Sequence, residues 1–192
     1  SQATPQMFWE ACLAGRGEPT LHPRFSELVR MIGATGIRNA IVTTGTNLNA
    51  KNLEACARDV QIIRLSISSI RRNIFEKVHI GLDYDRIWSN INSLAAEANK
   101  KIIVHLPGGA IIYPGLAETV NQLRHMGITE FRLLPLWNRG GSLKGKIENE
   151  ARLALAESLG ISLTEKEHIQ VPRWIFLGQV LQRKLINQKY CP

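Results

Sequence analysis

The sequence is poor in cysteine, which limits the metal and redox sites that it can build. It has three cysteines in 192 residues, Cys12, Cys56 and Cys191. They are too far apart to form a CxxC pair, which excludes a self-contained zinc or iron–sulfur site. Their odd number and wide spacing also argue against a disulfide framework. Cys12, inside an expected strand, and Cys56, on a face of an expected helix, are expected to be small buried hydrophobes. The cysteine content therefore indicates a cytoplasmic protein.

Long apolar runs are also absent. The longest, such as residues 102–106, are far too short to span a bilayer. The first six residues, SQATPQ, contain no basic stretch followed by an apolar run, so no signal peptide is expected there. Hydrophobic residues make up 44% of the chain and charged residues 21%, which suits one globular domain with a core.

Positive charge is in excess, but it is not concentrated. The formal net charge is +8, a value that would suit an anionic partner such as nucleic acid. The cations are scattered in short pairs, including Arg71-Arg72, Lys100-Lys101 and Arg183-Lys184. No aromatic residues interleave with them as they would on a base-stacking platform. A solvated basic surface is the preferred interpretation, and nucleic acid is not expected as a partner.

Short β-rich segments alternate with amphipathic segments along the chain. Strands are expected at residues 8–14, 39–44, 61–68, 101–106 and 130–136. Helices are expected near residues 23–33, 49–58, 84–98, 116–126, 148–159 and 175–185, with a polar loop over 70–82. Five βα units in a row predict a parallel sheet with right-handed crossovers. The apolar strands suggest that both of its faces are covered.

Two architectures fit this order, an open doubly wound sheet and part of a (β/α) barrel. Both place ligands at the carboxyl ends of the strands. The loop Gly15–Pro19 follows the first strand, and its glycines permit close backbone approach by a ligand. There, Glu18 can accept from an ammonium or hydroxyl group. The loop is not a dinucleotide fingerprint, because Thr20 stands at the last glycine position. An ordinary strand-to-helix turn remains the alternative.

The third strand adds a second candidate region. Arg64, Ser66 and Ser68 share one face of that strand, because side chains alternate along it. Small hydroxyl residues near a strand end leave room and donors for a polar ligand. They can equally bond to local backbone, so both interpretations stay open from spacing alone.

Several ordered segments resemble those of radical S-adenosylmethionine enzymes. The run Ala14–Pro23 (AGRGEPTLHP) resembles the family's GGE loop, and Thr43–Leu48 (TTGTNL) its TNGxxL segment. The segment Arg64–Ser69 (RLSISS) resembles the serine-bearing strand, and residues 75–91 are similar to the loop and helix that follow it. Together they cover residues 8–141, most of the chain.

The resemblance implies a fold and a domain organisation. The fold would be an α/β partial parallel (β/α) barrel of the radical S-adenosylmethionine type, with about five βα units and lacking the first one. Residues 1–145 would form this barrel core. Residues 146–192 would form a helical extension toward a missing auxiliary cluster domain of the SPASM type, whose first ligand could be Cys191. The missing unit would leave the strand edge at residues 8–14 open to a partner or a swapped segment.

The same resemblance assigns a cofactor and its contacts. S-adenosylmethionine would meet Gly15, Gly17 and Glu18 through its methionine amino group, with Pro19 fixing the turn that leaves the site. Ser66 and Ser68 would approach the ribose or the carboxylate. Backbone from Leu134 to Leu136 would meet the adenine. Thr44 matches the family's contact residue less closely, since the sequence has TTG where TNG is usual.

The family's chemistry also requires a four-iron four-sulfur cluster, held by a CxxxCxxC motif that this sequence does not contain. We expect the motif on a segment outside the chain, and the chain alone to be inactive. With the cluster, the enzyme would generate a 5′-deoxyadenosyl radical that modifies a substrate, such as a peptide or protein. A reductant such as flavodoxin or ferredoxin would supply the electron. The alternative is a catalytically inactive binding module.

Overall fold

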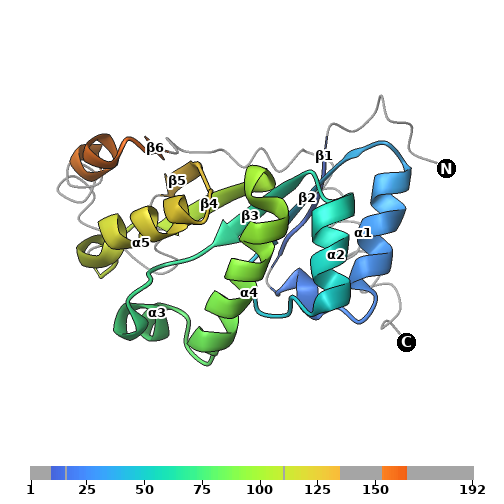
Figure 1. The fold of residues 1–192 in the computed structure, drawn as a ribbon, viewed down its shortest axis with the longest axis horizontal. Coiled ribbons are helices and arrows are strands. Elements are labelled where there is room, and N and C mark those ends of the chain that lie inside the picture. The colour runs from blue at the N-terminus through green and yellow to red at the C-terminus, as the bar shows by residue number, and fades with distance from the viewer. Residues whose placement is uncertain (1–9, 16, 110, 135–152, 164–192) are drawn as a thin grey trace, which may run out of the picture.

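The computed structural model describes residues 10–15, 17–109, 111–134 and 153–163, and these residues form one parallel sheet flanked by helices (Figure 1). Six strands lie side by side in the order in which they occur along the chain. They are β1 (Glu10–Leu13), β2 (Arg38–Thr43), β3 (Ile62–Ser66), β4 (Ile102–Pro107), β5 (Glu130–Leu134) and β6 (Ser162–Leu163). Every neighbouring pair is parallel.

The helices alternate with the strands as the sequence predicted. They are η1 (Pro19–Leu21), α1 (Phe25–Ala34), α2 (Ala50–Asp59), α3 (Arg72–Val78), α4 (Tyr84–Ala98), η2 (Asn99–Lys101) and α5 (Tyr113–His125). Residues 153–159 are helical as well. The prediction near 175–185 lies outside the described residues. In the part of the chain that the structure describes, no helix is long and apolar enough to cross a membrane.

Two elements were missed from the sequence. Helix α3 lies within the segment that was expected to be a polar loop. Its seven residues bury only the adjacent Ile74 and Phe75, so no helical period is visible. Strand β6 has two residues, too few for any alternation, and extends the predicted sheet by one strand beyond β5.

The strand order decides between the two predicted architectures. A doubly wound sheet reverses its strand order, which places helices on both faces. Here each strand pairs with the next one in the chain, so right-handed crossovers bring the helices to one face, as Figure 1 shows. The fold is therefore the predicted partial parallel barrel.

The opposite face of the sheet is more open than the apolar strands suggested. Along β3, Ile63 and Leu65 are fully buried against the helices, while the intervening Arg64 keeps 21% of its side chain exposed. Arg64 forms an ion pair with Glu10 of β1 at 2.9 Å. The expectation that Cys12 is a small buried hydrophobe is wrong. Cys12 is exposed, and its Sγ accepts from Arg64 at 3.4 Å, because it points to this open face.

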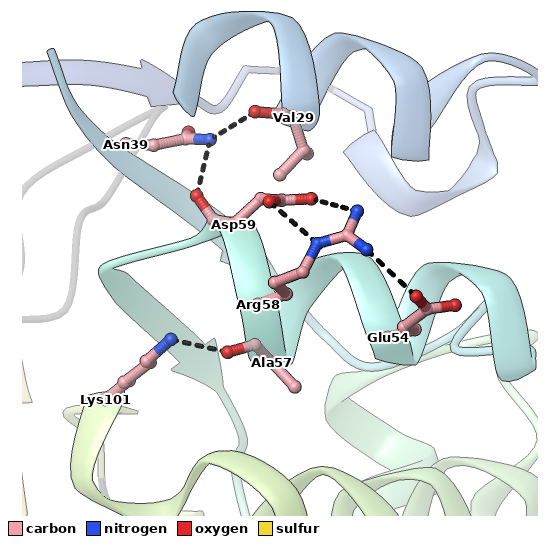
Figure 2. Close-up of polar contacts among 7 residues, drawn as sticks. All are labelled: Val29, Asn39, Glu54, Ala57, Arg58, Asp59 and Lys101. Atoms are coloured by element: carbon pink, nitrogen blue, oxygen red, sulfur yellow. Dashed lines mark hydrogen bonds and ion pairs between the residues drawn. The ribbon is translucent and has the colours of Figure 1, made fainter. Parts of the chain in front are cut away.

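A buried asparagine holds two helices to the amino-terminal part of β2 (Figure 2). Asn39 is fully buried, and its Nδ2 donates to the carbonyl oxygens of Val29 in α1 and Asp59 in α2, at 3.0 and 3.3 Å. Lys101 donates to the Ala57 carbonyl from the other side of α2. Buried amide-to-carbonyl bonds replace water at these backbone groups. This end of the sheet is thus occupied by structural contacts, which leaves the carboxyl ends of the strands for a ligand.

Strand β1 is an edge strand. Among the described residues it is hydrogen-bonded only to β2, at the register Glu10 to Arg38 through Leu13 to Ile41. This agrees with the sheet order expected of a barrel without its first βα unit. Coverage of the edge by another segment or chain stays a prediction.

Candidate functional site

The predicted glycine loop lies directly after β1, at the carboxyl ends of the strands. Gly15 and Gly17 both have open space around them in the described part of the chain: no atom of another described residue, their chain neighbours aside, lies within 4 Å of where a Cβ would stand. A ligand can therefore approach the backbone at both positions. The loop ends at η1, whose first residue is Pro19. Pro19 thus stands where its fixed φ favours the start of the turn.

The Glu18 carboxylate is bound by hydroxyl and amide groups from two segments. Oε1 accepts from Thr20 N at 3.1 Å, from Thr20 Oγ1 at 2.7 Å and from Thr43 Oγ1 at 2.7 Å. Oε2 accepts from Thr44 N at 2.8 Å and Thr44 Oγ1 at 2.7 Å. We call Glu18 with Thr20, Thr43 and Thr44 the Glu18 network. It ties the glycine loop to the end of β2.

The network keeps Glu18 ionised. Burial is the largest influence and raises the pKa of its carboxyl, but the hydrogen bonds from Thr43, Thr44 and Thr20 together outweigh it, so the pKa is lowered. A carboxylate offers about four lone-pair positions. The donors of the network already occupy them, so the side chain has little capacity left for a ligand. The contact expected between Glu18 and an ammonium group stays a prediction, and the structure gives this carboxylate a structural role.

The turn after β2 is fixed by further short polar contacts. Thr43 Oγ1 accepts from Gly45 N at 2.9 Å, and Gly45 has a φ of 82°, a region that favours glycine. Thr44 Oγ1 lies 2.6 Å from Thr46 Oγ1. Because Thr44 gives its proton to Glu18, Thr46 is the donor in that pair. Asn90 of α4 donates to the Gly45 carbonyl at 2.7 Å, so a third element supports the turn.

Two asparagines join the same pair of loops through backbone carbonyls. Asn47 and Asn52 both donate to the carbonyl of Thr20, at 2.7 and 3.1 Å, and Asn52 also donates to the Asn47 carbonyl. Asn52 is buried, so these bonds are protected from water. The sequence did not point to Asn52 or Asn90 as supporting residues, whereas Thr43 lies in the predicted TTGTNL segment. The available signal was the density of Thr and Asn after the second strand.

The predicted serines lie at the end of β3. Ser66 is partly exposed and stands opposite His105 of β4 in the register. Ser68 is fully buried, and its Oγ has no hydrogen-bond partner among the described residues. An unpaired buried hydroxyl is unusual, because leaving it unbonded costs free energy. Of the two alternatives weighed from the sequence, a bond to backbone is thus not made by Ser68 within the described residues, and contact with a ligand stays a prediction.

The predicted adenine contacts lie at the end of β5. The Leu134 carbonyl accepts from Gly108 N at 2.8 Å, and the Leu134 side chain is partly exposed. Leu136 lies outside the described residues. Glu18 is therefore hydrogen-bonded directly to Thr44. Ser66, Ser68 and Leu134 also lie at the carboxyl ends of the strands, but without a hydrogen bond to Glu18 or Thr44.

The described residues do not fit an iron–sulfur cluster. No group of three or more His, Cys, Asp or Glu side chains in the described part of the chain could hold a metal ion. Cys12 lies on the open face of β1, whereas Cys56 is buried on α2. Burial, aided by the charge of Glu18, raises the pKa of Cys56 to about 12, so its sulfur stays a protonated thiol. A thiol is not the ligand form of cysteine.

Similarity to known proteins is found in structure and not in sequence. No protein-family model matches the chain, and neither does any curated protein. The structure of Streptococcus suis SuiB bound to S-adenosylmethionine superposes with a TM-score of 0.65 at 18% identity, over 85% of this chain and 41% of SuiB. A domain of the pyruvate-formate lyase-activating enzyme from Bacteroides vulgatus gives 0.62 at 15% identity, over 80% of this chain and 97% of that domain.

These similarities define a class of fold. The chain has the partial parallel barrel found in radical S-adenosylmethionine enzymes. TYW1 with a lysine-pyruvate adduct bound shows the same fold at a TM-score of 0.60 and 15% identity, over 78% of this chain and 49% of that one. The chain spans about two fifths of the length of SuiB.

Proposed function

We propose that this chain binds S-adenosylmethionine at the carboxyl ends of its strands, as the barrel core of a radical S-adenosylmethionine enzyme. The observation that carries the proposal is the site itself: two glycines with open space beside them, next to a loop fixed by the Glu18 network. The shared fold supports it, since SuiB, which superposes on this chain, has been solved bound to S-adenosylmethionine. Gly15, Gly17 and Pro19 would border the methionine end.

The other predicted contacts extend this proposal across the sheet. Ser66 and Ser68 would meet the ribose or the carboxylate, and backbone near Leu134 and Leu136 the adenine. The unpaired Ser68 hydroxyl supports this placement, because a ligand group would give it the partner that the described residues do not. Thr44 would act through the turn that it holds rather than by direct contact, given its bonds to Glu18.

Radical chemistry would require a cluster that this chain's residues do not hold. We propose that its cysteine ligands lie outside the chain and that a reductant such as flavodoxin or ferredoxin supplies the electron. A peptide or protein is the proposed substrate class, which the SuiB complex with its precursor peptide SuiA supports. A cytoplasmic location is part of the same proposal, since such a cluster needs a reducing compartment.

Titration calorimetry of the chain with S-adenosylmethionine tests the binding proposal. We expect saturable binding by the unaltered chain and weaker binding by Ser68→Ala. Because no described residue bonds to the Ser68 hydroxyl, its removal should not lower the melting temperature. Ser93→Ala, on the exposed side of α4, is the control and should bind normally. No binding by the folded, unaltered chain would contradict the proposal.

A second function is favoured by the absent cysteine motif: a degenerate barrel that binds S-adenosylmethionine or a partner without cleaving it. Anaerobic iron–sulfide reconstitution of the complete gene product separates the two. Cluster formation, with 5′-deoxyadenosine released after reduction, would establish the radical enzyme. A folded product that takes up no iron would favour the binding module.

A further inference from the structure

The turn that carries Ser68 is held by a helix distant in sequence. Residues 67–71 connect β3 to α3 without regular structure. Thr119 of α5 is fully buried, and its Oγ1 accepts from the backbone N–H of Ile70 at 2.9 Å. The same hydroxyl donates to the Gly115 carbonyl at 2.7 Å. Since its only proton goes to Gly115, a lone pair is oriented for Ile70.

Other contacts fix the same turn from two sides. The Tyr84 hydroxyl of α4 donates to the Ile70 carbonyl, so both backbone groups of Ile70 are bound by side chains of packed helices. Gly115, one turn before Thr119, lies so close that an added Cβ would stand 2.7 Å from Ser69 Oγ. Ser69 is itself fully buried and accepts from Arg71 N at 3.0 Å. The turn therefore has a single packed position against α5.

We propose that Thr119 is a positioning residue for the ligand site: by binding Ile70 it fixes the turn that presents Ser68 and the adjoining end of β3. The inference rests on the proposed function, because it takes S-adenosylmethionine as the ligand. Thr119 itself makes no ligand contact. Its effect reaches the ligand through Ile70 and the two neighbouring serines. The unpaired, fully buried Ser68 hydroxyl is the second observation that marks this turn as a place where another group is expected.

The matched variants are Thr119→Val, which keeps the shape and removes the acceptor, and Thr119→Ser, which keeps the acceptor. For the valine variant we expect the Ile70 amide to exchange with deuterium about fivefold faster or more, since it loses its bond. We expect a similar rise in the dissociation constant for S-adenosylmethionine, about fivefold. Thr119→Ser should restore both values. Asn121→Ala, which changes an exposed side chain of α5, should change neither appreciably.

The outcomes separate this inference from the function on which it rests. If the unaltered chain binds S-adenosylmethionine and Thr119→Val binds it equally well, the inference is overturned and the proposed function stands. Faster exchange at Ile70 with unchanged affinity also overturns the inference alone, since Thr119 would then be only structural. If the unaltered chain, shown to be folded by its melting curve, does not bind S-adenosylmethionine, both are overturned.

Discussion

At the residue scale, the role of Glu18 depends on the orientation of its donors. Both carboxylate oxygens accept a backbone N–H, Oε1 from Thr20 and Oε2 from Thr44. A glutamine in its place must turn its NH₂ toward one of these N–H groups, whichever way the amide is flipped. We expect Glu18→Gln to lower the free energy of unfolding by about 1–3 kcal/mol at neutral pH, measured by urea denaturation.

The same carboxylate gives a pH dependence with a definite sign. The folded pKa of Glu18 is lowered, so its stabilisation is present above the ordinary glutamate pKa and is lost as the pH falls through the folded value. The stability difference between the unaltered chain and Glu18→Gln should therefore shrink as the pH is lowered from about 7 to about 3. A difference that stays constant over this range would contradict an ionised Glu18 in the network.

The Glu18 network shows which features of a site the sequence predicts and which it does not. The sequence predicted that Glu18 lies at a strand end and that Thr44 lies near the site. It did not predict that the two bond to each other, because their separation in space depends on the β1–β2 register and on the turn at Gly45. Cys12 was misjudged for a related reason: alternation defines two faces, but it does not say which one the helices cover.

At the element scale, the best-predicted features are those with local signals. The bounds of α4 match the prediction of residues 84–98, because Asp83 caps its start by accepting from Arg86 N and its apolar stripe is complete. In contrast, α3 and β6 are too short to show a period, and packing against their neighbours determines them. Local periodicity therefore predicted the long elements and missed the short ones.

Two glycines in different helices give opposite predictions for the same substitution. At Gly115 an added Cβ would lie 2.7 Å from Ser69 Oγ and 3.2 Å from Ile74 Cδ1, so Gly115→Ala should destabilise the fold by about 1–3 kcal/mol. At Gly33 the nearest atom, the Asp59 carbonyl oxygen, lies at 3.5 Å, an ordinary contact. Gly33→Ala should therefore stabilise α1 by up to about 1 kcal/mol, through its helix propensity.

Urea denaturation of both variants and of the unaltered chain measures the change in the free energy of unfolding that each substitution causes. Each variant is the control for the other, because the chemical change is identical and only the surroundings differ. Equal stability of Gly115→Ala and the unaltered chain would show that α5 can move away from the turn after β3. That result would also weaken the argument that this turn has one packed position.

At the scale of the whole molecule, the residue patterns predicted the connectivity, whereas the strand order was predicted by the family resemblance alone. The alternation of strands and helices indicated a parallel sheet, but both a doubly wound sheet and a partial barrel satisfied it. Sequential pairing from β1 to β6 selects the barrel, and this pairing arises from contacts between segments far apart in the sequence. Only the resemblance of segments such as Ala14–Pro23 pointed to the barrel beforehand.

The net charge of +8 provides a test that separates two kinds of ligand. S-adenosylmethionine carries a sulfonium, an ammonium and a carboxylate, so its net charge has the same sign as the chain, and added salt should leave its affinity unchanged or slightly higher. Binding of random RNA would instead release counterions and fall by orders of magnitude as salt rises from about 50 to about 200 mM. Titrations of both ligands across this range of salt concentration measure how the affinity for each one changes with salt. Two results together would contradict the site proposed here: tight RNA binding that weakens steeply as salt rises, and S-adenosylmethionine binding that salt also weakens. The scattered cations would then act together as an anion-binding surface.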